Sequence, residues 1–301
     1  MRFLFIITFI AALGCSPNSN HIETQKGQFI VLTTTQMLAD AIRPHLSDSC
    51  TIDVLFPQGV DPHSYRPVPS DVQRLQRADA IVFNGLHLEA NMESMFDFLS
   101  TQKPCISIAQ FVPKSKLIPL DEHVYDPHIW FDILLFGQAG KQLADSLAKA
   151  LNPTLASPNT RFMDSLIQLD LFLRQSWAKR SKPDKSICSV HDAFSYYCRA
   201  YQLTQMSLQG VSTTAEFGVY EVDAMVEFLV KNNIRVAYTE VHSMAKTMKA
   251  VQLGCRQRGH AISIGPPLLT DAPAPGNNPG NHWPGMVLEN SRILLTPIPY
   301  D

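Results

Sequence analysis

The sequence has few charged residues and no run of basic ones. Charged side chains make up 17% of the 301 residues, and the formal net charge is −2. A nucleic-acid-binding surface needs clustered Lys and Arg side chains to neutralise phosphates, so no nucleic acid partner is expected. The hydrophobic content of 45% is enough for a sizeable core, which at this length favours two lobes over one.

The chain also lacks an N-terminal hydrophobic run long enough to cross a bilayer, which takes roughly 20 residues. Residues 1–14 (MRFLFIITFIAALG) are too short, and Cys15 follows at once. One Arg, an apolar run and small residues before a Cys are typical of a bacterial lipoprotein signal peptide, although Ala12 stands where Leu is usual. We expect a lipid on Cys15, a polar tether over 15–27 and an extracytoplasmic location, in the periplasm or at the cell surface. A soluble secreted protein, with Cys15 incidental, is the alternative.

Two short motifs that are typical of metal sites are missing. The remaining cysteines show no Cys-x-x-Cys spacing, which argues against a metal–thiolate site; they are Cys50, Cys105, Cys188, Cys198 and Cys255. An oxidising compartment would permit one or two disulfides, but buried free thiols are favoured. The His-Glu-x-x-His motif of zinc hydrolases, which places a general base beside an open metal, is also absent.

Two series of apolar runs alternate with helical patterns. The first series is FIVLTTT (29–35), TIDVLFP (51–57), AIVFNG (80–85) and CISIA (105–109); the second is KSICSVH (185–191), QMSLQGV (205–211), RVAYTEV (235–241) and AISIGPP (261–267). Such alternation predicts an α/β fold with two parallel-sheet, Rossmann-like lobes. We assign residues 28–136 to an N-terminal lobe, 137–183 to a connecting segment and 184–301 to a C-terminal lobe.

The connecting segment has no strand character. Residues 160–180 carry apolar side chains at helical spacing, namely Phe162, Leu166, Leu169, Phe172 and Leu173. The basic residues Lys179 and Arg180 suit a helix C-terminus. This pattern predicts one long helix that joins the lobes, although an ordinary helix within a larger single domain would give the same pattern.

Four candidate metal ligands each follow an apolar run that is read as a strand. They are His63 in GVDPH, His128 in DPHIW, His191 in SVHDAF and Asp271 in LLTD. They lie far apart in the sequence, which excludes a local zinc finger and suits a cleft at the carboxyl ends of several strands. Three imidazoles and a carboxylate suit a divalent transition metal.

Neighbouring residues have several possible roles. Asp61 is expected to bond backbone amides in the turn before His63, and Asp126 to cap a helix near His128. Glu216 and Glu240 are either partners of ligand N–H groups or surface carboxylates. His123 is expected to be a solvated loop residue. His282 could compete as a ligand but is read as a surface or gate residue.

Six collinear segments carry a resemblance to a known family. They are GVDPHSYRPVPSD (59–71), DPHIWFD (126–132), SVHDAFSYYCRAYQL (189–203), GVSTTAEFGV (210–219), TEVHSMAKTMKAVQ (239–252) and LLTDAPAP with GNHWPGMVLEN (268–275, 280–290). The chain resembles the TroA-like (cluster A-I) metal receptors of ABC-type zinc and manganese importers. The resemblance implies His63, His128, His191 and Asp271 as ligands, and a long helix that allows only limited closure of the lobes.

The resemblance further implies a monomeric substrate-binding protein, not an enzyme, that delivers its metal to an ABC permease and its ATPase. No cofactor is expected; Zn²⁺ or Mn²⁺ is the bound substrate. A nitrogen-rich ligand set favours zinc, and related manganese receptors often carry Glu where His191 stands. A metal-stabilised surface adhesin and, less favoured, a metal-dependent hydrolase are the alternatives.

Overall fold

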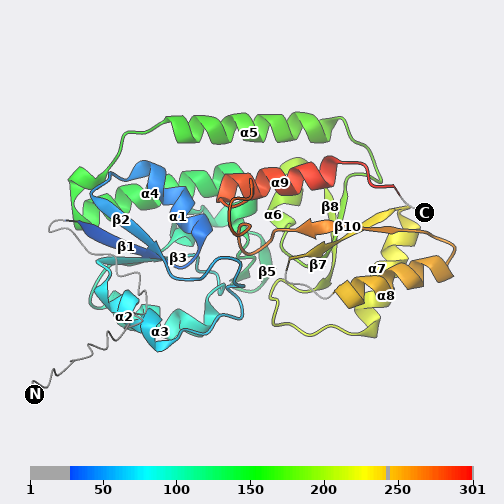
Figure 1. Ribbon diagram of the computed structural model, residues 1–301, viewed down its shortest axis with the longest axis horizontal. Helices are drawn as coiled ribbons and strands as arrows, with labels where there is room; N and C mark the ends of the chain where they lie inside the picture. The colour runs from blue at the N-terminus through cyan, green and yellow to red at the C-terminus, as the bar shows by residue number, and fades with distance from the viewer. Residues whose placement is uncertain (1–27, 242–244, 300–301) are drawn as a thin grey trace, which may run out of the picture.

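The computed structural model describes residues 28–241 and 245–299, so the predicted signal peptide and tether, Cys15 included, lie outside the described part. The chain forms two lobes that lie side by side, each built on parallel strands (Figure 1). The two-lobe α/β fold predicted from the alternating pattern is confirmed. Within the described residues, no helix is both long and apolar enough to cross a membrane.

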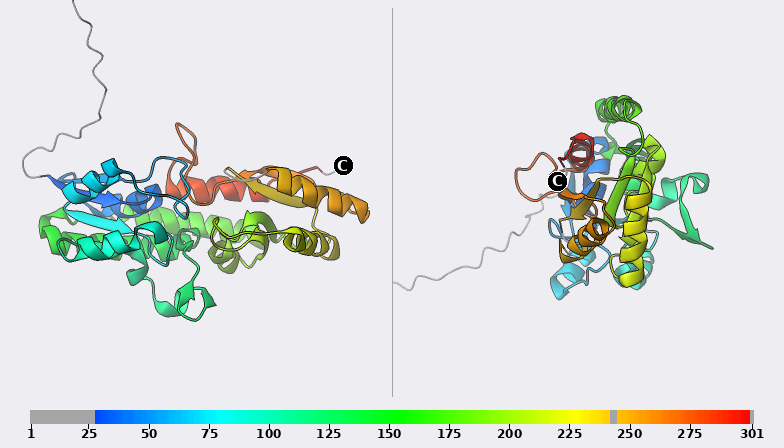
Figure 2. Two further views of the ribbon diagram at one scale, coloured as in Figure 1. Left: turned by 90° about the horizontal axis from the view of Figure 1, so that it is seen from below. Right: turned by 90° about the vertical axis from the view of Figure 1, so that its right-hand side faces the viewer.

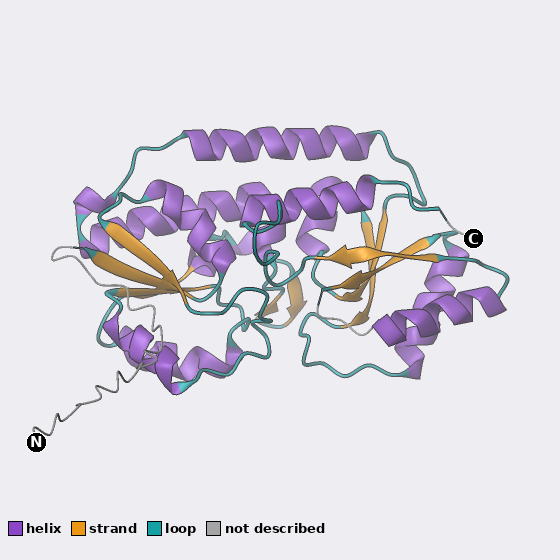
Figure 3. Ribbon diagram, viewed as in Figure 1, coloured by secondary structure: helices purple, strands orange, loops and turns teal. Residues whose placement is uncertain are grey.

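The N-terminal lobe is a four-stranded parallel sheet in the order β2-β1-β3-β4. Its strands are β1 (Phe29–Thr33), β2 (Cys50–Val54), β3 (Ala80–Phe83) and β4 (Cys105–Ser107). Helices α1 (Gln36–Ile42) and α4 (Ile133–Leu151) cover one face, and α2 (Pro69–Arg77) and α3 (Glu93–Ser100) cover the other (Figure 3). Because both faces are covered, the central strands β1 and β3 are nearly continuous apolar runs, whereas β2 at the edge of the sheet alternates apolar and polar residues.

Helix α4 lies mostly in the predicted connecting segment, but it packs against the N-terminal lobe. It begins where the Asp132 carboxylate accepts a hydrogen bond from the Leu135 N–H at 3.1 Å, a standard N-cap. Residues 137–151 continue this helix, which packs on α1. A Cβ on Gly140 would lie 2.8 Å from the Ala41 side chain, so only glycine permits this close approach of the two helices.

The C-terminal lobe pairs its strands in two parallel sets. Strand β7 (Ser186–His191) pairs with β8 (Thr204–Gln209), and β9 (Val236–Glu240) pairs with β10 (Ser263–Leu268), while β7 and β9 lie beside each other. The helices of this half are α6 (Ser195–Tyr201), α7 (Val219–Lys231), α8 (Ala245–Gln257) and α9 (Trp283–Leu295). The carboxyl ends of β7, β9 and β10 point toward the N-terminal lobe (Figure 1).

Two helices extend along both lobes. Helix α5 (Arg161–Ala178) runs above α4 and α9, as the predicted linking helix would, and it buries Leu166, Leu173 and Trp177 (Figure 1). Phe172, which belongs to the predicted apolar pattern, is instead 53% exposed. Helix α9 returns from the C-terminal half to pack on α1, and Trp283 at its start is fully buried against Phe136 of α4.

A small hairpin precedes the second histidine motif. Strands β5 (Pro119–Asp121) and β6 (Val124–Tyr125) pair in antiparallel fashion and project from the body of the molecule (Figure 2). The sequence placed a strand before each histidine, but for His128 that strand is only β6, which belongs to neither main sheet. A short 3₁₀-helix, Ile129–Phe131, follows His128 instead.

Candidate metal centre

His63 stands on the loop that follows β2, and its backbone is fixed by the preceding aspartate. One oxygen of Asp61 accepts a hydrogen bond from the His63 N–H at 2.8 Å, and the other accepts from the Ser64 hydroxyl at 3.0 Å. Pro62 between them has a fixed φ, which further restricts the turn. The expected role of Asp61 in the turn is confirmed.

His128 is fully buried, and Asp126 holds it twice. One Asp126 carboxylate oxygen accepts from the His128 N–H at 2.9 Å and pairs with ring Nδ1 at 2.7 Å. The predicted helix-capping role of Asp126 is therefore wrong, because the carboxylate is used by the imidazole and Asp132 caps the helix. With Nδ1 engaged, Nε2 is the nitrogen free to bind a metal.

His191 is the last residue of β7, and Glu240 is the last residue of the neighbouring β9. One oxygen of Glu240 accepts from the backbone N–H groups of Val190 and His191, and the other pairs with Nδ1 of His191. Of the two carboxylates proposed as partners, Glu240 therefore contacts a candidate ligand, whereas Glu216 is exposed.

Asp271 follows β10, and the residue before it is tied to the opposite lobe. The Trp130 indole N–H donates to the Thr270 carbonyl at 3.0 Å, and the Trp283 indole N–H donates to the Trp130 carbonyl at 2.8 Å. Both tryptophans are fully buried. The chain of two indoles thus connects the segment that carries His128 to the segment that carries Asp271.

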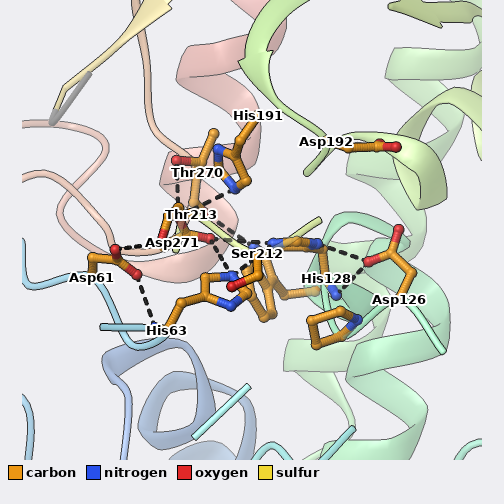
Figure 4. Close-up of polar contacts among 12 residues, drawn as sticks. Asp61, His63, Asp126, His128, His191, Asp192, Ser212, Thr213, Thr270 and Asp271 are labelled. Carbon is orange, nitrogen blue, oxygen red and sulfur yellow. Dashed lines mark hydrogen bonds and ion pairs between the residues drawn. The ribbon is translucent and has the colours of Figure 1, made fainter. Parts of the chain in front are cut away.

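The four candidate ligands converge on one buried point between the lobes (Figure 4). Their donor atoms all lie within 4.8 Å of one another. Nε2 of His63 lies 3.3 Å from Nε2 of His128, and the Asp271 carboxylate lies 3.4 Å from His128 Nε2, 3.3 Å from His191 Nε2 and 3.8 Å from His63 Nε2. The sequence indicated this set in two ways, through the repeated strand-end context and through the resemblance to the TroA-like receptors, but neither gave the distances between the donor atoms.

Burial and the shared carboxylate determine the protonation of the site. Burial lowers the pKa of His63 to about 4, although Asp271 opposes the shift. Burial also disfavours protonation of His128, but Asp126 and Asp271 outweigh it and raise the pKa to about 9. Likewise, Asp271 and Glu240 outweigh burial and raise the pKa of His191 well above its usual value. Burial raises the pKa of Asp271, but the three imidazoles outweigh it and hold that pKa well below the usual range.

The orphaned atoms of the site also fit a positive ion. Among the described residues, Oδ1 of Asp271 is buried without a well-formed hydrogen bond, although Nε2 of His128 lies 3.4 Å away. A buried carboxylate oxygen without a partner is costly, and a bound cation would satisfy it. Once His128 and His191 have lost their protons, the four side chains together offer three imidazole nitrogens and one anionic oxygen, which is a suitable donor set for a divalent transition metal.

The other residues considered from the sequence lie outside the cluster. His123 is an exposed hairpin residue that pairs with Glu122, and His282 is the N-cap of α9, where its Nδ1 accepts from the Gly285 N–H at 3.1 Å. The five described cysteines are free thiols, as favoured from the sequence. Burial raises the pKa of the Cys188 thiol to about 12, which makes it a poor ligand.

Comparisons with known proteins identify the family of the chain. The protein-family model described as "Zinc-uptake complex component A periplasmic" matches residues 31–296. The chain is 30% identical to the zinc-binding protein TroA of Treponema pallidum, over 96% of this chain and 97% of TroA. It is also 30% identical to the manganese-binding lipoprotein MntA of Bacillus subtilis, over 98% of this chain and 97% of MntA.

A comparison with solved structures also finds TroA. The solved structure of periplasmic TroA superimposes with a TM-score of 0.84 at 30% identity, covering 89% of this chain and 98% of the TroA chain. These relatives are metal-binding proteins of importers and not enzymes, so the hydrolase considered from the sequence is rejected. The chain belongs to the family of periplasmic zinc-uptake component A, the TroA-like substrate-binding proteins of zinc and manganese ABC importers.

Proposed function

We propose that the protein captures Zn²⁺ outside the cytoplasmic membrane through His63, His128, His191 and Asp271, and delivers it to an ABC permease and its ATPase. The observation that carries the proposal is the convergence of the four donor atoms within 4.8 Å in a buried position. Four protein ligands would close the coordination shell, which suits transport of the ion rather than catalysis on it.

The donor set supports zinc over manganese, and part of its spacing is compatible with a tetrahedral ion. A tetrahedral zinc ion with bonds of about 2.0–2.1 Å to nitrogen separates its ligand atoms by about 3.4 Å. Three separations are close to that value: 3.3 Å between His63 and His128, 3.4 Å between His128 and Asp271 and 3.3 Å between His191 and Asp271. The separation of 3.8 Å between His63 and Asp271 is longer and would shorten on binding. Nitrogen donors also bind zinc more tightly than manganese in the Irving–Williams order.

A competition experiment tests the choice of metal. The metal-free protein is titrated with Zn²⁺ and Mn²⁺ against a common chelator, and uptake of each ion is measured in a strain that lacks the gene. We expect tighter binding of zinc and loss of zinc uptake in the deletion strain. Rescue of growth by manganese without rescue by zinc would overturn the zinc assignment. Full growth on limiting metal would instead favour a metal-stabilised adhesin.

The ligand set is tested by single alanine substitutions at the four positions. Each removes a quarter of the coordination shell, so we expect a severe loss of zinc affinity in every variant. The matched controls are His123→Ala, which is exposed, and His282→Ala, which loses only a helix cap worth about 1 kcal/mol. Wild-type affinity in His63→Ala or His191→Ala would contradict the proposed site.

We further propose that a lipid on Cys15 anchors the protein, as the MntA relative is also a lipoprotein by name. The Cys15→Ser variant is expected to lose membrane association and retain zinc binding. Mass spectrometry of the membrane-extracted protein that shows an unmodified or internally cleaved N-terminus would disprove the anchor.

A further inference from the structure

The loop of residues 210–218 contains no metal ligand, yet it reaches across the candidate metal centre. It follows β8 in the C-terminal lobe, and its Thr213 hydroxyl donates to the Asp61 carboxylate of the N-terminal lobe at 2.6 Å (Figure 4). The loop itself is braced, because the Gln209 side-chain amide donates to the carbonyls of Thr213 and Ala215. A half-buried hydroxyl from one lobe is thus held against a half-buried carboxylate of the other.

Asp61 connects this hydroxyl to a metal ligand. Its second oxygen, Oδ2, accepts from Thr213, while Oδ1 accepts from the His63 N–H at 2.8 Å. Any rotation of the His63 loop away from the site therefore has to break the contact with Thr213 or the contact within the Asp61 turn. Thr213 acts on His63 only through Asp61.

The His63 loop is the ligand-bearing segment that has the least other support. Asp126 holds the ring of His128, Glu240 holds the ring of His191, and the Trp130 indole holds the residue before Asp271. Among the described residues, the ring of His63 has polar contacts only with the ligands His128 and Asp271.

The His63 loop also borders an open space. A cavity of about 230 Å³ lies between residues 57–60 and residues 271–274, so the loop is not packed against other side chains on this side. Gln58, in this loop, is exposed. The hydrogen bond from Thr213 to Asp61 is therefore one of the few contacts that restrain this part of the loop.

We propose that Thr213 is a positioning residue that locks the His63 loop through Asp61 and so slows release of the bound metal. This inference rests on the proposed function, because the released ion is the transported substrate. The hydrogen bond to a carboxylate is the kind that contributes most among side-chain contacts, and we expect its loss to accelerate release about tenfold.

The test measures the rate at which the full-length protein, loaded with one equivalent of Zn²⁺, loses the ion to excess chelator. Thr213→Val keeps the shape and removes the hydroxyl, so release should accelerate about tenfold. Thr213→Ser keeps the hydroxyl and should release zinc at the wild-type rate. The matched control is Thr214→Val, whose hydroxyl contacts Ser212 and not Asp61, and it should also behave as wild type.

A double-mutant cycle separates positioning from a general effect on folding. If Thr213 acts through Asp61, adding Thr213→Val to Asp61→Ala should accelerate release no further. The melting temperature of metal-free Thr213→Val should fall only by the few degrees that one lost hydrogen bond costs, whereas a general folding defect would lower it much further. Unchanged release in Thr213→Val, or the same acceleration with and without Asp61, would overturn the inference.

Metal binding by the wild-type protein distinguishes a failure of the Thr213 proposal from a failure of the proposed function. Wild-type protein that binds zinc or manganese, together with a silent Thr213→Val substitution, contradicts the lock and leaves the proposed function intact. Wild-type protein that binds neither ion contradicts both.

Discussion

The Glu240 carboxylate holds both the backbone N–H and the ring of His191, although Glu240 is not a proposed metal ligand. In Glu240→Gln the amide oxygen still accepts from the two backbone N–H groups, but the amide nitrogen cannot accept the Nδ1 proton of His191. Replacing such a partner of a ligand imidazole typically costs about 10- to 100-fold in metal affinity. We expect that loss in a chelator-competition titration with Zn²⁺. The control is Glu216→Gln at an exposed carboxylate, and equal affinities of the two variants would refute this role.

The protonation of the same residues makes metal binding depend on pH. The pKa of His128 is raised to about 9 and that of His191 is also raised, so both imidazoles hold protons at pH 7 in the metal-free protein. A metal binds neutral imidazole, so up to about two protons must leave, and affinity should rise with pH from about 6 toward 9. Calorimetry in buffers of different ionisation enthalpy measures this release. Glu240→Gln should release fewer protons than Glu216→Gln, and the absence of any buffer dependence would contradict the prediction.

At the level of single residues, the sequence predicted the candidate ligands better than the side chains that form hydrogen bonds with them. The Asp-Pro-His repeats indicated His63 and His128 because the restriction imposed by proline is local. The choice between Glu216 and Glu240 stayed open, since Glu240 reaches His191 from a different strand. Thr213 had no predictable role either, because its contact with Asp61 joins segments 152 residues apart.

At the scale of helices, strands and loops, the indoles of Trp130 and Trp283 connect the segment that carries His128 to the segment that carries Asp271. Trp130→Phe would leave the Thr270 carbonyl without its donor, which costs about 1–3 kcal/mol in the free energy of unfolding. Because Trp130 and Thr270 flank His128 and Asp271, we expect zinc affinity to fall as well. Urea unfolding and zinc titration measure the two effects separately.

Trp177→Phe is the matched control for this substitution. The Trp177 side chain is equally buried, but its indole donates to the Tyr197 hydroxyl, away from the four candidate ligands. It should lower stability by a similar amount and leave zinc affinity unchanged. Equal zinc affinities in the two variants would show that the indole contacts support folding only.

The elements themselves were largely predictable, and their packing was not. The strand runs at 29–35, 51–57, 80–85 and 105–109 correspond to β1 to β4 because continuous apolar runs are a local signal. The sequence did not indicate that α9 returns to the N-terminal lobe, where Trp283 packs on Phe136. That contact depends on the shape of two distant surfaces, which no local pattern records.

The whole molecule has few ways to close around an ion. Helix α5 extends along both lobes, and α9 contacts both α1 and β10. One continuous set of buried side chains includes Phe136 of the N-terminal lobe together with Phe194, Tyr197 and Trp283 of the C-terminal half. Movement of one lobe as a rigid body would expose part of this shared core to water, at about 25 cal/mol per Å² of apolar surface. The contacts therefore favour a local movement of the His63 loop over a hinge closure.

This arrangement predicts that the metal stabilises the protein without compacting it. Binding to the folded chain alone adds about 2.7 kcal/mol when free Zn²⁺ is at 100 times its dissociation constant, so the melting temperature should rise clearly. Small-angle X-ray scattering should give the same radius of gyration with and without Zn²⁺. The His63→Ala variant should show no comparable rise in melting temperature under the same conditions. A clear decrease of the radius on adding zinc to the wild type would instead require the lobes to separate in the metal-free state, against the continuous core and the Trp130–Thr270 contact.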